Sequence, residues 1–93
     1  MVIGVCEVEL YIPNALSLKD KRRYLQGLIK RLRNNFNASV AEIDYKDKWQ
    51  RAIIGIACID ERQREIDTRF SEIISYISRE KDLELINYSI EMF

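Results

Sequence analysis

The stretch VIGVCEVELYI, Val2–Ile12, decides the fold of this 93-residue chain. It is rich in β-branched residues, and every second side chain is apolar, whereas Glu7 and Glu9 fall on the opposite face. This period of two is typical of a β-strand with one face in a core. Pro13 ends the strand, because proline has no N–H to donate to a ladder. The apolar face needs a cover, and the following segments supply it.

Two later segments have helical periodicity. In residues 17–36 the apolar side chains form one stripe, and Ser17 is the expected N-cap, with Asp20 completing a variant of the capping box. Asp60 is the expected N-cap of a second helix, in which apolar residues recur at helical spacing from Ile66 to Ile77.

Three further segments read as strands: residues 38–45, residues 49–59, whose run Ala52–Ile59 is apolar on both faces, and residues 83–92. The resulting order is βαββαβ. Right-handed crossovers then give a four-stranded antiparallel sheet of order 4-1-3-2 with both helices on one face. The sequence therefore predicts a single α+β domain over residues 1–93, a ferredoxin-like sandwich.

The other face of that sheet is predicted to be bare and too apolar for a monomer in water. We therefore expect a homodimer, formed through this face or through an edge strand. Its sheet-face contacts are expected at Ile3, Val5, Trp49, Arg51 and Ile53. The full set placed on this face is Ile3, Val5, Glu7, Glu9, Tyr11, Val40, Glu42, Trp49, Arg51, Ile53, Ala57 and Ile59.

Three carboxylates, Glu7, Glu9 and Glu42, are expected to gather around Arg51 on the bare face. One interpretation is a metal site or an acid–base pair. The other is cross-strand ion pairing, which the alternation of strand residues commonly produces and which we favour. An enzyme that uses these carboxylates is the least favoured of the function hypotheses.

Most catalytic chemistries lack their residues here. The chain has no histidine, and its three glycines are isolated, so neither an imidazole base nor a phosphate-binding loop can be built. An acylphosphatase-like activity would need glycine and arginine in the loop of residues 13–17, which has neither. We expect no enzyme, no cofactor and no metal site.

Cys6 and Cys58 lie in apolar runs without C-x-x-C spacing, which indicates buried, reduced thiols. The N-terminal apolar run is too short for a signal peptide, and no stretch approaches the length of a membrane span. We expect a cytoplasmic protein.

The first predicted helix concentrates positive charge in a chain whose net charge is zero. Such a surface attracts a polyanion such as RNA, although a solvated helix face is the common alternative. Base stacking on the sheet is disfavoured, because Tyr11 and Trp49 lie at strand ends and glutamates lie between. Lys46 and Lys48 add charge nearby. The helix holds one acid, Asp20, and seven basic residues, Lys19, Lys21, Arg22, Arg23, Lys30, Arg31 and Arg33.

Three blocks of sequence resemble the YlxP-like family of small bacterial proteins: SLKDKR (17–22), RLRNNFNASVAEID (31–44) and WQRAIIGIA (49–57). Tyr45 stands where many relatives are expected to have histidine. The positions that match the family's motifs are Ser17, Leu18, Lys19, Lys21, Arg22, Trp49, Gln50 and Arg51.

The resemblance implies a ferredoxin-like fold with no established catalytic residues. The family's genes commonly lie beside those for transcription and translation factors and a ribosome-binding factor, which implies an RNA- or ribosome-associated role. The favoured hypothesis is a non-enzymatic binding protein that uses the basic helix. The alternative is a protein-interaction or structural dimer module without nucleic-acid binding.

Overall fold

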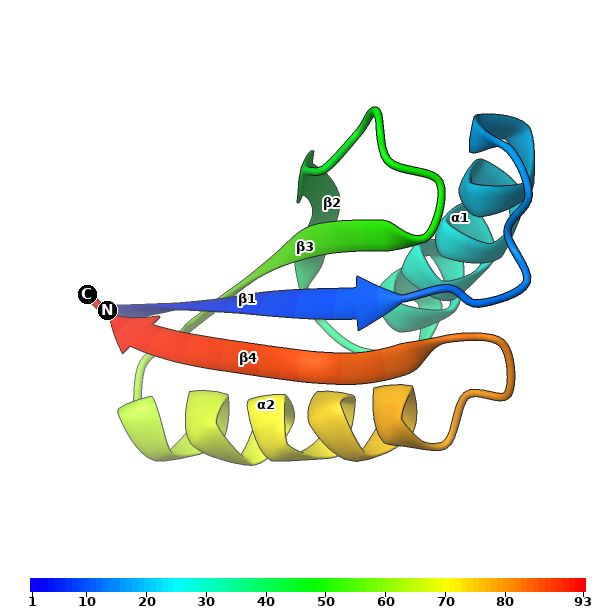
Figure 1. Cartoon of the computed structure of the whole chain (residues 1–93). Coiled ribbons are helices and arrows are strands. Elements are labelled where there is room, and N and C mark those ends of the chain that lie inside the picture. Colours follow the sequence, from blue (N-terminus) through cyan, green and yellow to red (C-terminus); the bar gives the residue numbers. More distant parts are fainter.

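The computed structural model describes residues 1–93 and confirms the order βαββαβ. The strands pair antiparallel in the order β2-β3-β1-β4, which is the predicted 4-1-3-2 sheet (Figure 1). The elements are β1 (Val2–Tyr11), α1 (Leu18–Asn35), β2 (Ser39–Asp44), β3 (Arg51–Asp60), α2 (Gln63–Ser78) and β4 (Glu84–Met92).

The central pair of strands, β1 and β3, carries the sheet side of the core. Their register runs unbroken from Val2 opposite Asp60 to Tyr11 opposite Arg51. Alternate residues of both strands are buried, as the period of two predicts. The core is closed by the buried apolar side chains of the two helices, which are Leu25, Leu28, Ile29 and Leu32 of α1 and Ile66, Phe70, Ile73 and Ile77 of α2.

Helix α2 packs tightly against β1 at Gly4. A Cβ atom there would lie 2.5 Å from Cγ2 of Ile66 and 2.8 Å from Cε2 of Phe70. Glycine is therefore required at this point of the strand, because any side chain would push the helix off the sheet.

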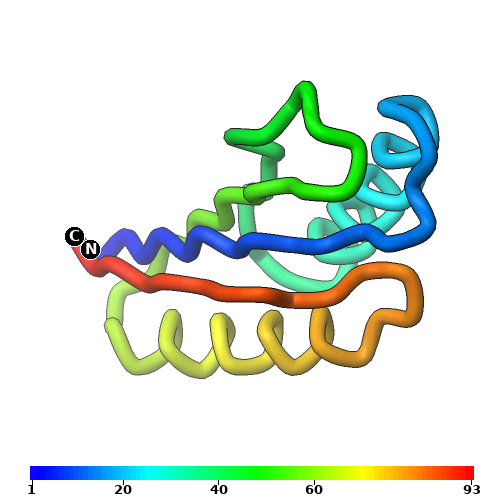
Figure 2. The backbone as a smooth tube through the Cα atoms, in the orientation of Figure 1, coloured from blue at the N-terminus to red at the C-terminus, as the bar shows by residue number.

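The chain ends meet at the far end of the central strands (Figure 2). The N–H of Ile3 donates to the carbonyl of Phe93 at 3.0 Å, and the N–H of Phe93 donates to the carbonyl of Ile3 at 2.8 Å. The C-terminal residue thus extends the pairing of β4 with β1. Neither helix combines the length and apolarity that crossing a membrane requires.

The prediction that Val40 and Glu42 of β2 lie on the bare face is wrong. Val40 pairs with Ile56 and Glu42 pairs with Ile54, and both partners point toward the helices. Val40 and Glu42 therefore lie on the helix side of the sheet, and Ala41 occupies the bare face in their place. The strand carries apolar residues on both faces, so its sequence alone does not decide which face turns inward.

Two predicted element boundaries also shift. β3 begins at Arg51, so Trp49 lies in the preceding loop and not on the sheet face. Arg62, not Asp60, is the N-cap residue of α2. The predicted N-cap of α1 is confirmed, because Oγ of Ser17 accepts from the N–H of Asp20 at 3.0 Å.

The two cysteines are free and buried, with exposures of 0% for Cys6 and 2% for Cys58. Burial raises the pKa of the Cys6 thiol to about 11 and also raises that of Cys58. We expect neither thiol of the folded protein to react with Ellman's reagent at neutral pH, since the thiolate is the reactive form. Both should react once the protein is unfolded in guanidinium chloride. Rapid labelling of the native protein would contradict this packing.

Candidate nucleic-acid interface

The seven basic residues of α1 do not form one surface, because the structure gives them different partners. One is buried, three are engaged by nearby oxygen atoms, and three have neither kind of contact. This division decides which of them can contact a ligand.

Lys21 is the buried member, with a side chain that is 1% exposed. Its Nζ lies 2.9 Å from Oε2 of Glu42 and also donates to the carbonyl oxygen of Tyr45. The predicted role of Lys21 in contacting phosphate is therefore not supported by its position, since the ammonium is closed off from solvent.

The spacing of Lys21 could have revealed this burial. It stands four residues before Leu25, seven before Leu28 and eleven before Leu32, so it occupies the first position of the apolar stripe. A lysine in such a stripe needs a buried anion or carbonyl oxygen, which β2 and the loop after it provide.

Gln50 makes the second tie at this end of the molecule. Its Nε2 donates to the carbonyls of Pro13, at 3.0 Å, and Ala15, at 3.3 Å, in the loop before α1. Both ends of the loop of residues 45–50 are thus held near the start of α1, Tyr45 by Lys21 and Gln50 by the loop before the helix. Gln50 of the WQRA block therefore reaches the loop just before the SLKDKR block, and Lys21 of the SLKDKR block reaches Tyr45.

Three basic residues of α1 are engaged by nearby oxygen atoms. Arg31 pairs with Glu80 at 2.9 Å, which links α1 to the loop after α2. Arg23 lies 3.8 Å from Asp20, an exposed and weak contact. Arg33 donates to the carbonyl of Val40, so its charge has no carboxylate partner.

Lys19, Arg22 and Lys30 form no ion pair. A row of polar side chains runs along the side of α1 that faces β2, with successive spacings of four, four and three residues. Its members are Arg22, Gln26, Lys30 and Arg33. At about 1.5 Å per residue, this row is about 16 Å long. It lines a groove whose other lining residues are Leu25, Gly27, Ile29, Ala41 and Glu42.

The groove is electropositive. Arg22, Lys30 and Arg33 each bring a positive charge, and Glu42 is the single acid in the lining. Because Lys21 neutralises Glu42 from the buried side, the three positive charges remain uncompensated. We call this the α1–β2 groove, and its field favours an anion.

The bare sheet face does not hold the predicted cluster of three carboxylates. Glu9 pairs with Arg51 at 2.6 Å, which confirms the cross-strand ion pair. Glu42 lies on the opposite face, beside Lys21, and no group of three or more potential metal ligands gathers in the structure. The predicted role of Glu42 in this cluster is wrong, because this residue does not lie on the bare face.

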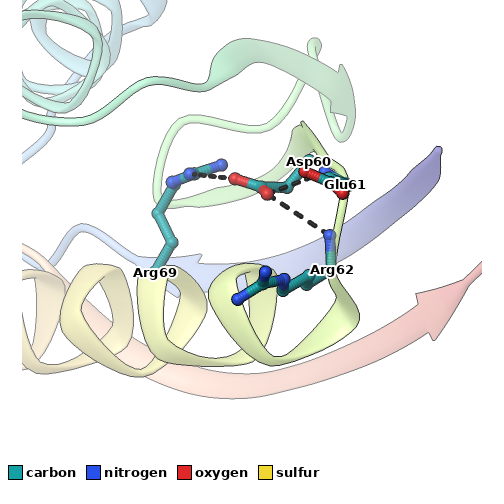
Figure 3. Close-up of polar contacts among 4 residues, drawn as sticks. All are labelled: Asp60, Glu61, Arg62 and Arg69. Carbon is teal, nitrogen blue, oxygen red and sulfur yellow. Dashed lines mark hydrogen bonds and ion pairs between the residues drawn. The ribbon is translucent and has the colours of Figure 1, made fainter.

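Asp60 and Arg69 form a brace between β3 and α2 that the sequence did not reveal (Figure 3). Oδ1 of Asp60 accepts from the N–H groups of Glu61 and Arg62, and Oδ2 lies 3.1 Å from the Arg69 guanidinium. The N–H of Arg62, helped by Arg69, holds the pKa of Asp60 below its usual range. The brace ties α2 to the end of β3.

The sheet order and the two helices define an α+β protein with a ferredoxin-like fold. The family model described as "Protein of unknown function (DUF503)" matches residues 3–90. The chain is also similar to the "Uncharacterized protein YlxP" of Bacillus subtilis (strain 168), with 35% identity over 83 residues, which cover 89% of this chain and 90% of that protein. The chain belongs to the DUF503 family, and its resemblance to YlxP-like proteins is confirmed.

The Lys21–Glu42 pair is open to a direct test of stability. We expect Lys21→Met to lower the free energy of unfolding by roughly 3 kcal/mol, because it leaves a mostly buried carboxylate without a counter-charge. The double variant Lys21→Met, Glu42→Met should recover most of that loss, since neither charge is then left alone. Chemical denaturation measures both, and equal losses in the two variants would contradict the pairing.

Proposed function

We propose that this protein is a small cytoplasmic, non-enzymatic binding protein that associates with RNA or a ribosomal particle through the α1–β2 groove. The observation that carries the proposal is the row Arg22, Lys30 and Arg33, whose charges no carboxylate neutralises. A neutral chain that keeps three cations together on one side has a surface suited to phosphate groups.

The groove is a better candidate than the sheet face. On the face, Glu7 is exposed and Glu9 already neutralises Arg51, so a phosphate backbone would meet net negative charge. In the groove the charge is positive and the lining has both polar and apolar parts. Contacts of this kind give affinity that falls steeply with salt.

Charge reversal in the groove tests the proposal. We expect Arg22→Glu with Lys30→Glu to weaken RNA binding at low salt by at least about tenfold, because two phosphate contacts become repulsive. The dependence of log affinity on log salt should also become shallower, since each lost contact contributes a slope of about 0.7 to 0.9. Fluorescence anisotropy of a labelled RNA measures both effects.

The matched control is Arg64→Glu with Lys81→Glu, which changes the net charge equally at exposed positions outside the groove. It should bind RNA nearly as the wild type does. Equal weakening by both variants would mean that only net charge matters. If the wild type shows no salt-sensitive binding to RNA and does not cosediment with ribosomal subunits in sucrose gradients, the proposal is wrong.

A homodimer is a second proposal, and the uncovered sheet face supports it. Ile3, Ile43 and Ile59 are 37%, 47% and 52% exposed there, beside partly buried Val5 and Ile53. An apolar cleft runs over the same face and the β2 edge, lined by Val5, Arg33, Ala38, Ser39, Val40, Ala41, Ile43, Gly55, Ile56 and Ala57. A second copy of the chain would remove this surface from water.

Light scattering tests the dimer. At micromolar concentration the wild type should have the mass of a dimer, and Ile43→Lys should shift it toward the monomer, because a charge would have to be buried in the contact. Ile90→Lys is the matched control, since Ile90 is similarly exposed, at 40%, but pairs with the buried Cys6 and so lies on the helix side of the sheet. A monomeric wild type would contradict this second proposal.

A further inference from the structure

Trp49 is a large aromatic side chain that has no role in the packing of the core. It is 56% exposed and contributes nothing to the hydrophobic core. It also lies outside β3, so it does not belong to the uncovered sheet face. An indole held in water at a fixed place is typical of a binding surface.

The loop that carries Trp49 is firmly held. The carbonyl of Tyr45 accepts from the N–H of Lys48 at 3.0 Å and also from the buried Nζ of Lys21. On the other side of Trp49, the backbone carbonyl of Gln50 accepts from the N–H of Ile12 at 2.9 Å. The side-chain amide of Gln50 donates to the loop before α1. Trp49 therefore stands between two anchored residues, so binding through it would cost little ordering of the loop.

This loop lies at one end of the α1–β2 groove. Lys21, which binds the loop, directly precedes Arg22, the first basic residue of the groove. Lys46 and Lys48 are exposed in the loop and form no ion pair, and with Asp47 between them the loop of residues 45–50 has a net charge of 2 − 1 = +1. A polyanion that follows the groove toward the start of α1 would thus reach further positive charge beside the exposed indole.

We infer that Trp49 is a stacking platform for an unpaired base, and that the groove takes single-stranded nucleic acid. This inference rests on the proposed function and narrows its ligand. Every base has a face that can stack on an indole, while the bases of a duplex are already stacked on one another. A cationic groove with an exposed aromatic residue at its end is the combination that single strands require.

A protein partner is the main alternative occupant, because Trp is also frequent at the centres of protein interfaces. Leu16, which is 72% exposed in the loop that Gln50 holds, would suit such a partner. The charges favour nucleic acid, since Lys46 and Lys48 of the same loop are cations without carboxylate partners and outnumber Asp47 between them. Leu16 therefore serves as the control in the test.

The chain has one tryptophan, so its fluorescence reports on this position alone. We expect single-stranded oligouridylate to quench it at low salt, and an RNA duplex to quench it much less. Trp49→Ala should weaken single-strand binding by about 5- to 150-fold, as measured by anisotropy of a labelled oligonucleotide. Trp49→Phe should retain most of the affinity, and Leu16→Ala should leave it unchanged.

The failures of the two proposals can be told apart. If the wild type binds no RNA, the proposed function fails and this inference fails with it. If binding is lost in the Arg22→Glu, Lys30→Glu variant but Trp49 is not quenched and Trp49→Ala binds normally, the groove stands and the stacking platform is overturned. Equal quenching by duplex, or a loss in Leu16→Ala that matches the loss in Trp49→Ala, would also overturn it. Thermal unfolding of each variant confirms that it is folded.

Discussion

The ammonium of Lys21, held between the Glu42 carboxylate and the Tyr45 carbonyl, is the contact on which this end of the molecule depends. Burying a charged lysine is costly, and the pair adds little net stability relative to apolar side chains. Its effect is on register. With Glu42 facing Lys21, β2 turns Val40 into the core and Ala41 outward, and a slip of one residue would leave the ammonium without a counter-charge. The same contact places the loop that follows β2.

Structural and candidate binding residues alternate within one short motif. Ser17 and Asp20 cap the start of α1, and Lys21 locks β2, while Lys19 and Arg22 have no ionic partner. The local charge of the helix therefore overstates the charge available to a ligand. The groove keeps three of these charges, and because Lys21 neutralises Glu42 from inside, the net charge of its lining is +3 and not 3 − 1 = +2.

The topology of the fold could be predicted because β1 and β3 have unambiguous patterns, one strictly alternating and one apolar on both faces. The face that each residue of β2 occupies could not be predicted, since its short sequence offers apolar residues to either face. The spacing of Lys21 places it in the apolar stripe and so indicates burial, but its positive charge led to the prediction of an exposed, phosphate-binding side chain. The ties made by Gln50 and the brace between Asp60 and Arg69 join segments whose proximity only the folded chain reveals.

The groove and the apolar cleft share two lining residues, Arg33 and Ala41, so the two surfaces meet at β2. This limits the geometry of any dimer that also binds a polyanion. Pairing of two β2 edges would bring both grooves together and set their arginines and lysines against one another, which like-charge repulsion opposes. Contact through the uncovered face would bury Ile3, Ile53 and Ile59 while both grooves stay open. A dimer whose grooves also bind a polyanion is thus possible only when the uncovered face, and not the β2 edge, forms the principal contact between the two copies.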